Sequence, residues 1–296
     1  MNFQLSGAGV ALITPFHADE RIDHPALGRM VDFMVDGGMD FIVALGTTAE
    51  TPALGKQDRL EVLDAIRDRL NGRIPLILGM GGNDTHELIE HVNSFDLSGV
   101  QALLSVTPYY NRPSQEGLYR HYARLAESTH LPIVLYNVPA RTGCNLTADT
   151  TLRLARDFPH IVGTKEASGD FGQICRILHE RPDGFLVFSG DDLLSLPFLA
   201  LGAQGVISVI ANAYPQTFSE MVRAGLRGKF LEALALHHQL LPAVQGIFSE
   251  GSPAGVKSIL AHRGIIEPHL RLPLVGVSDA LRAALAQLDE AWQGER

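Results

Sequence analysis

The chain has 296 residues, of which 46% are hydrophobic and 19% are charged, so its composition is that of a folded protein with a large core and excludes a disordered chain. A formal net charge of -9, with no run of basic residues, argues against a nucleic-acid partner. No apolar run reaches about 18 residues and the first residues lack a signal-peptide pattern, so we expect no membrane span and a cytoplasmic location.

Eight short apolar runs follow one another along the chain, and amphipathic stretches of helical period separate them. The runs cover residues 9–16, 39–46, 74–81, 100–108, 131–139, 160–168, 184–192 and 205–212. We interpret all eight as strands buried on both faces, as in a parallel sheet. Strict alternation with helices, repeated eight times, predicts an α/β fold of the (β/α)8 TIM-barrel type.

The strand pattern stops after residue 212, and the remainder of the chain has only helical patterns. We expect a catalytic barrel over residues 1–226 and a small C-terminal helical appendage over residues 227–296. The alternative is an open doubly wound sheet that binds a dinucleotide. It is disfavoured because "GMGGND" has Asp84 where the dinucleotide fingerprint needs its last glycine.

Lys165 stands near the end of the sixth run, in "HIVGTKEASGD", where a charge is unfavourable. It is the only lysine on a strand pattern, because Lys56, Lys229 and Lys257 fall in or between helices. A buried lysine tends to lose its proton, and the neutral amine can attack a carbonyl to form a Schiff base. Lys165 is therefore the candidate nucleophile.

A structural role for Lys165 is the alternative, in which the ammonium group pairs with a carboxylate such as Glu166 or Asp191. Other polar residues at the strand ends favour chemistry, since the active sites of such barrels lie there. Tyr136 lies near the end of the fifth run and could transfer protons, while Arg141 in the following loop could bind a carboxylate.

The motif "GTTAE" at residues 46–50 follows the second run with a glycine turn and two hydroxyls, Thr47 and Thr48. Hydroxyls and backbone N–H groups at a strand-to-helix junction suit an anion such as a carboxylate. Helix capping would also explain Thr48 and Glu50. The motif alone leaves both interpretations open.

Metal and hydrolase signals are weak. In "HELIEH" the histidines His86 and His91 are five residues apart, so they point about 140° apart on a helix, and we expect both to be solvated. Cys144 and Cys175 are too few for a disulfide framework and have no ligand partner nearby. No serine lies in a GxSxG motif. We predict no catalytic metal and no hydrolase.

Six motifs together resemble a known family. They are "GTTAE", "TPYYNRPSQEGLYRHY", "YNVPARTG", "GTKEASGD", "FSGDD" and "GVISVIAN". In order and spacing they resemble the dihydrodipicolinate synthase branch of the pyruvate-dependent class I aldolases, which include N-acetylneuraminate lyase. The resemblance covers nearly the whole chain.

The resemblance implies a lyase that uses no cofactor. Lys165 would form a covalent Schiff base with pyruvate, and the resulting enamine would add to L-aspartate-4-semialdehyde. The product would be 4-hydroxy-tetrahydrodipicolinate, at the entry to diaminopimelate and lysine biosynthesis. A homotetramer built as a dimer of dimers is also implied.

The resemblance also implies roles for other residues. Tyr136, Thr48 and Tyr110 would form a proton relay, with Tyr110 reaching into the site of a neighbouring subunit. Thr47 and Thr48 would hold the pyruvate carboxylate, and Arg141 the carboxylate of the semialdehyde. The remaining positions implied are backbone positions that line the site, Gly190 and Ile207.

A site for feedback by L-lysine would fall at Thr51, Pro52, Lys56, Arg59, Asn83, Glu87 and Tyr109. Lys56 and Arg59 replace histidines of the feedback-sensitive pattern and bring cations near a dibasic ligand, so we predict weak or absent inhibition. Two other functions stay open: a related lyase acting on a sugar acid or a 4-hydroxy-2-oxo acid, and a catalytically silent sensor of pyruvate or an amino acid.

Overall fold

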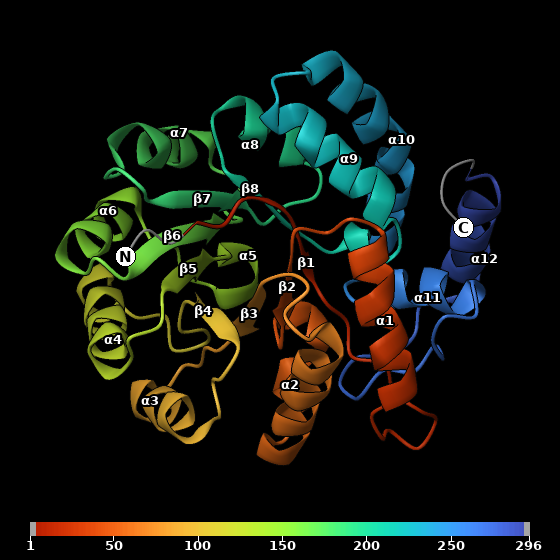
Figure 1. Cartoon of the computed structure of the whole chain (residues 1–296), viewed down its shortest axis with the longest axis horizontal. Helices are drawn as coiled ribbons and strands as arrows, with labels where there is room; N and C mark the ends of the chain where they lie inside the picture. The colour runs from red at the N-terminus through yellow and green to blue at the C-terminus, as the bar shows by residue number, and fades with distance from the viewer. Residues whose placement is uncertain (1–3, 293–296) are drawn as a thin grey trace.

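The computed structural model describes residues 4–292. Eight parallel strands close into a barrel in chain order, and the first pairs with the last. Figure 1 shows these strands at the centre, with helices around them. The predicted (β/α)8 TIM barrel is confirmed.

The strands are β1 Gly7–Ala11, β2 Phe41–Ala44, β3 Leu76–Gly79, β4 Val100–Val106, β5 Ile133–Asn137, β6 Ile161–Glu166, β7 Leu186–Ser189 and β8 Gly205–Ser208. The helices between them are α1 His24–Asp36, α2 Lys56–Leu70, α3 Thr85–Ser94, α4 Gln115–Ser128, α5 Pro139–Thr142, α6 Ala148–Asp157, α7 Phe171–Glu180 and α8 Ser195–Ala200. Seven strands lie inside their predicted runs, and β1 begins before its run. The runs overshoot because the turns at the strand ends are buried too.

The strands are apolar on both faces because each face meets a different core. In β2, Phe41 and Val43 point into the barrel, whereas Ile42 and Ala44 pack against the surrounding helices. The barrel interior is filled tightly next to this strand. A Cβ on Gly9 of β1 would lie 2.1 Å from the ring of Phe41, so only glycine fits at that position.

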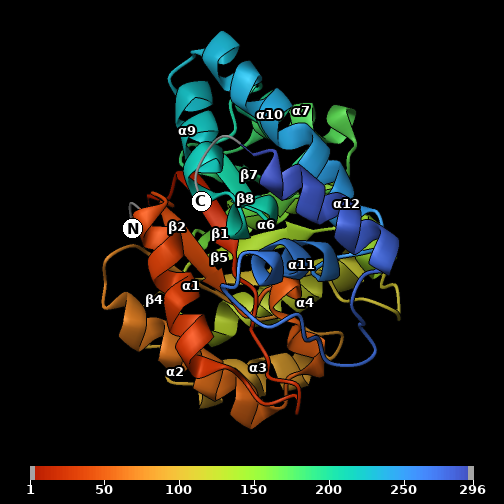
Figure 2. The same cartoon turned by 90° about the vertical axis from the view of Figure 1, so that its right-hand side faces the viewer.

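Four helices follow β8 in the described part of the chain: α9 Pro215–Leu226, α10 Phe230–Phe248, α11 Ala254–His262 and α12 Asp279–Glu290. As predicted, α9 packs on β1 and β8 and completes the outer ring. Figure 2 shows α10, α11 and α12 beside the barrel, where α10 and α11 both contact α12. The division into units at residue 226 stays a prediction.

No helix within residues 4–292 combines the length and apolar character needed to cross a membrane.

Candidate active site

Lys165 points into the barrel near the end of β6. In the sheet register it is the partner of Tyr136 on β5 and of Phe188 on β7, and both of these side chains belong to the inner core. Partners in adjacent parallel strands project to the same face, so Lys165 shares that interior. Its side chain is buried, and Nζ lies 4.4 Å from the centre of the Tyr136 ring.

The two carboxylates named in the structural alternative for Lys165, Glu166 and Asp191, make their contacts elsewhere, so neither is its partner. Glu166 is the next residue of the strand and therefore projects to the opposite face. Its carboxylate accepts hydrogen bonds from Asn137 Nδ2 at 3.1 Å and from the Ser168 backbone at 2.8 Å. Asp191 accepts from the backbone N–H two residues further on, at 2.9 Å.

Asp192 is the carboxylate whose charge acts on Lys165. One of its oxygens accepts from the backbone N–H groups of Val209 and Ile210, at 3.1 and 2.9 Å. The other oxygen is buried without a hydrogen-bond partner among the described residues. Burial raises the pKa of Asp192, and a hydrogen bond from the Ser208 side chain together with these backbone bonds opposes that rise.

Burial lowers the pKa of Lys165 to about 8. The negative charge of Asp192 opposes this shift, and the positive charge of Arg141 adds to it. At pH 7 a lysine with that pKa is neutral in about a tenth of the molecules, whereas an ordinary lysine is neutral in fewer than about one in a thousand. The site therefore keeps a supply of the reactive amine near neutral pH.

The turn after β2 carries the two threonines of "GTTAE". Residues Thr47–Ala49 form one turn of 3-10 helix. The Thr47 side chain lies near the phenol of Tyr136, and Thr48 is buried. Burial raises the pKa of Tyr136, while Arg141 and Thr47 oppose that rise. The phenol thus stays protonated near neutral pH and has a hydroxyl group nearby that can exchange protons with it.

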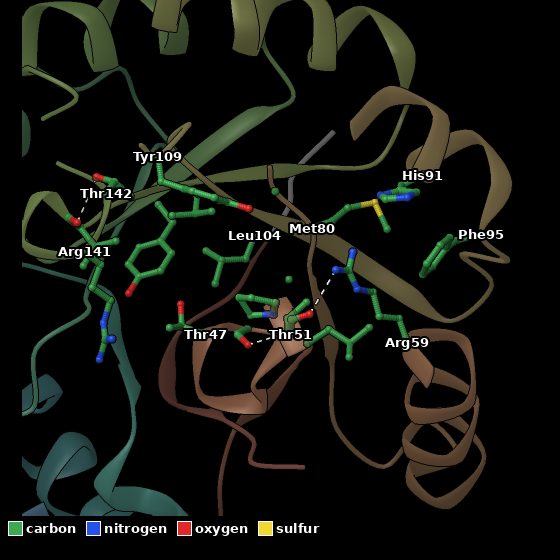
Figure 3. A pocket seen from close by; sticks show the side chains of 18 residues that line it. Thr47, Thr51, Arg59, Met80, His91, Phe95, Leu104, Tyr109, Arg141 and Thr142 are labelled. Carbon is green, nitrogen blue, oxygen red and sulfur yellow. Dashed lines mark hydrogen bonds between the residues drawn. The ribbon is translucent and has the colours of Figure 1, made fainter. Parts of the chain in front are cut away.

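A cavity of about 300 Å³ opens between the strand ends (Figure 3). Tyr136, Thr47 and Arg141 line it, together with Tyr109. Figure 3 shows Thr47 and Arg141 toward one end of the cavity and Arg59, His91 and Phe95 toward the other. The phenol of Tyr136, the hydroxyl of Thr47 and the guanidinium of Arg141 thus line one cavity. Lys165 is not in the lining, and its amine lies against the ring of Tyr136.

Only part of the predicted feedback site lines this cavity. The lining residues among the seven are Thr51, Pro52, Arg59 and Tyr109, and those outside the lining are Lys56, Asn83 and Glu87. The prediction that His91 is fully solvated is wrong. Its ring packs 6.0 Å from that of Phe95 and lines the cavity, since α3 turns that face toward the barrel.

Tyr110 does not approach Lys165 within its own chain. Its side chain is 89% exposed, and its backbone is in the left-handed region at φ 74°. Gly190 and Ile207, which the resemblance places along the site, are not among the residues that line this cavity. A Cβ on Gly190 would lie 2.8 Å from Cε of Lys165, and Ile207 is buried in the inner core. Glycine at position 190 therefore leaves room for the lysine stem.

Glu50 and Lys257 form a buried ion pair that sequence reasoning missed. Capping is one interpretation of Glu50, and the structure places this residue between two 3-10 turns, where its side chain makes no capping hydrogen bond. Lys257 lies in a C-terminal helix, α11, as expected, but it is completely buried. The available signal was a lysine in the apolar segment "GVKSIL".

Three potential metal ligands, His17, Asp23 and Glu267, have ligand atoms within 4.8 Å of one another. They lie apart from the cavity lining. Asp23 already accepts a hydrogen bond from the Ala26 backbone at 2.9 Å as the N-cap of α1, and His17 Nδ1 lies 3.1 Å from Glu267. Their geometry is explained by these local contacts.

Comparison with known proteins identifies the family of this chain. The model of the Dihydrodipicolinate synthetase family matches residues 4–291. The chain is 49% identical over 291 residues to the 4-hydroxy-tetrahydrodipicolinate synthase of Parabacteroides distasonis, covering 97% of this chain and 98% of that protein. It is 50% identical over 289 residues to the enzyme of the same name from Phocaeicola vulgatus, covering 96% and 97%.

Among solved structures, the chloride-inhibited dihydrodipicolinate synthase from Acinetobacter baumannii in complex with pyruvate matches with a TM-score of 0.94. The identity to it is 38%, and the match covers 97% of this chain and 98% of that one. The resemblance predicted from six motifs is thus confirmed, and the chain belongs to the dihydrodipicolinate synthetase family.

Proposed function

We propose that this chain is a 4-hydroxy-tetrahydrodipicolinate synthase, which condenses pyruvate with L-aspartate-4-semialdehyde in diaminopimelate and lysine biosynthesis in the cytoplasm. The observation that carries the proposal is Lys165, a lysine buried inside the barrel against Tyr136 with its pKa lowered to about 8. The names of the curated relatives and the pyruvate complex of a similar structure support the same substrates.

The chemistry needs no cofactor. The neutral amine of Lys165 adds to the carbonyl carbon of pyruvate, and loss of water leaves an imine. Removal of a methyl proton gives an enamine, which attacks the aldehyde carbon of the second substrate. The amino group of that substrate then closes the ring onto the imine carbon and releases Lys165, so one water leaves for each product formed. Tyr136, with Thr47 at its hydroxyl, is the proton carrier closest to these atoms.

Arg141 favours this synthase over the related sugar-acid lyases. Arg141 belongs to the short helix α5, which follows β5. Its side chain lines the same cavity as Tyr136. A guanidinium binds a carboxylate through two parallel hydrogen bonds. L-aspartate-4-semialdehyde has such a carboxylate, whereas the hydroxyl groups of a sugar chain do not match this charge.

A homotetramer built as a dimer of dimers is part of the proposal. Tyr110 is 89% exposed at the mouth of the barrel, so it is free to enter the site of a second copy. Three other large apolar side chains, Phe171, Leu193 and Leu201, are about two-fifths exposed. Mixing Tyr110→Phe with Lys165→Ala chains tests this, since a shared site would regain activity that neither variant has alone.

The experiment that tests the function measures consumption of both substrates. With pyruvate present, we expect the purified chain to consume L-aspartate-4-semialdehyde in equal amounts. Adduct formation with pyruvate but no consumption of the semialdehyde would favour a related lyase, to be assayed with N-acetylneuraminate and 4-hydroxy-2-oxo acids. Reversible pyruvate binding without an adduct would favour a sensor.

A further inference from the structure

The Glu50–Lys257 pair joins the turn after β2 to the C-terminal helices. Both side chains are fully buried, and Lys257 Nζ donates to one oxygen of Glu50. The same Nζ donates to the backbone carbonyl of His269 at 3.0 Å and lies 4.4 Å from the centre of the Phe16 ring. The ammonium group thus links β-barrel and C-terminal segments that are far apart in sequence.

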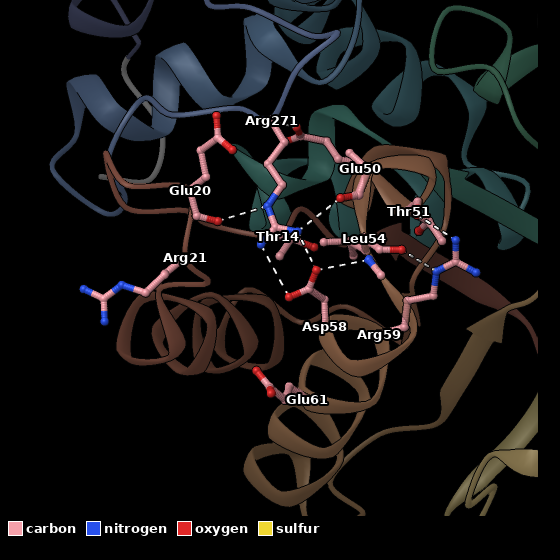
Figure 4. A network of polar contacts seen from close by, with 12 residues as sticks. Thr14, Glu20, Arg21, Glu50, Thr51, Leu54, Asp58, Arg59, Glu61 and Arg271 are labelled. Atoms are coloured by element: carbon pink, nitrogen blue, oxygen red, sulfur yellow. Dashed lines mark hydrogen bonds and ion pairs between the residues drawn. The ribbon is translucent and has the colours of Figure 1, made fainter.

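The second oxygen of Glu50 makes another long-range contact. It accepts a hydrogen bond from the backbone N–H of Arg271 at 2.9 Å. The guanidinium of Arg271 in turn donates to the Ala53 carbonyl at 3.1 Å and pairs with Asp58 at the start of α2. Figure 4 shows Arg271 among Glu50, Asp58 and Glu20. The segment that follows the turn is therefore attached at Glu50, Ala53 and Asp58 to one C-terminal strap, residues 269–271.

The attached turn carries the threonines of the candidate site. Glu50 follows the Thr47–Ala49 turn directly and has a left-handed backbone at φ 59°, which is unusual for a residue other than glycine. A third contact comes from Thr14, whose hydroxyl donates to the Ala49 carbonyl at 2.9 Å. A backbone in that region persists only where surrounding contacts hold it.

We infer that Glu50 and Lys257 are positioning residues for pyruvate, acting through Thr47 and Thr48. The inference rests on the proposed function. The pair fixes the turn in which Thr47 lines the cavity and Thr48 is buried. It thereby makes the C-terminal helices part of the support of the candidate site. A buried ion pair suits this task because a buried carboxylate without its partner is strongly unfavourable. The turn is therefore held in the one position that keeps Glu50 beside Lys257.

Kinetics of Lys257→Met in the full chain tests the inference. A displacement of the turn on the scale of an ångström is expected to raise KM for pyruvate at least about tenfold. KM for L-aspartate-4-semialdehyde at saturating pyruvate should stay within about twofold, because Arg141 lies on a different element. Lys257→Arg, which keeps the charge, should recover most of the pyruvate affinity.

Arg263→Met is the matched control. Arg263 forms another buried ion pair in the C-terminal region, with Asp289, and also donates to the Ala213 carbonyl. It does not contact the turn after β2. The Tm of each variant is measured, and both are assayed well below it, so that lost stability and lost positioning are separated. Arg263→Met should leave KM for pyruvate within about twofold.

If Lys257→Met does not fold, Thr14→Val replaces it as the test variant. Valine has nearly the same shape as threonine, so Thr14→Val removes only the hydrogen bond to the Ala49 carbonyl. We expect KM for pyruvate to rise about threefold in this variant, in keeping with the loss of one buried hydrogen bond. An unchanged KM in Lys257→Met, or in Thr14→Val where the former is unfolded, overturns the inference. Equal increases in Lys257→Met and Arg263→Met overturn it as well.

The wild-type chain is the reference in the same experiment. If it forms no pyruvate adduct and consumes no semialdehyde, the proposed function fails and the inference fails with it. If the wild type is active and the lysine variants show no selective change in KM for pyruvate, the inference fails alone.

Discussion

Lys165 and Lys257 are both buried lysines, and burial lowers the pKa of each to about 8, yet their surroundings differ. Lys257 meets a carboxylate and a carbonyl, which hold its ammonium group in place. Lys165 has no hydrogen bond or ion pair at Nζ among residues 4–292 and lies beside a cavity. We therefore propose that an unpaired amine next to space for a substrate, and not burial alone, marks the nucleophile.

The largest expected effect separates the two lysines by activity. Lys165→Ala should lower turnover by at least about 10⁴-fold, because no other group can form the imine. Lys257→Met should keep measurable turnover once it is folded. Steady-state assays of both variants check this. If Lys165→Ala turned over as fast as the wild type, Lys165 would not be the nucleophile and would not differ from Lys257 in role.

Replacing the two lysines should change the stability of the fold in opposite directions. The pKa of Lys165 is about 8 in the fold and about 10.4 in an unfolded chain, so the charged form destabilises the fold by about 3 kcal/mol below pH 8. Lys165→Met should therefore be more stable than the wild type at pH 7, and this gain should shrink between pH 8 and pH 10. Urea unfolding at several pH values measures it.

Lys257→Met should instead lose about 3 kcal/mol at pH 7, because it leaves the carboxylate of Glu50 buried without its partner. A loss of stability in Lys165→Met as large as in Lys257→Met would mean that both lysines are structural.

Arg141→Ala tests what surrounds the reactive lysine. We expect kcat/KM for L-aspartate-4-semialdehyde to fall about 100-fold while the pyruvate adduct still forms, because a charged bidentate contact to the second substrate is lost. Arg176→Ala is the matched control, since Arg176 pairs with Glu180 and Asp149 on the surface. An unchanged kcat/KM in Arg141→Ala would mean that the carboxylate binds elsewhere.

The rate of pyruvate capture should follow the ionisation of Lys165. At low pyruvate concentration, borohydride trapping should speed up about tenfold per pH unit up to pH 8 and level off above it, since only the neutral amine reacts. Quenched-flow trapping between pH 6 and pH 9 measures this. A flat profile over that range would indicate that another step limits capture.

The smallest expected effect concerns L-lysine. Arg59 lies at the far end of the cavity and donates hydrogen bonds to the carbonyl groups of Leu54 and Thr51. Carbonyl groups are neutral, so they do not cancel its charge as the carboxylate of Glu50 cancels that of Lys257. A dibasic ligand is repelled there. Sub-millimolar L-lysine should change activity less than about twofold in initial-rate assays. Clear inhibition at that concentration would contradict the prediction.

Much of the barrel could be predicted from the sequence because its strands are buried on both faces and interrupted at regular intervals. Lys165 could be found because a charge at the end of such a strand has few explanations. Its carboxylate neighbour could not, since Asp191 and Asp192 are adjacent and only the fold decides which one turns inward. The Glu50–Lys257 pair spans 207 positions, and no local pattern encodes such a contact.

The most direct test of this account is peptide mapping after borohydride reduction of the chain with pyruvate. We predict that the adduct lies on Lys165 and that Lys257 carries none, although burial lowers the pKa of both to a similar value. An adduct on Lys257, or a reduced chain without any adduct, would contradict the claim that the unpaired amine inside the barrel is the nucleophile.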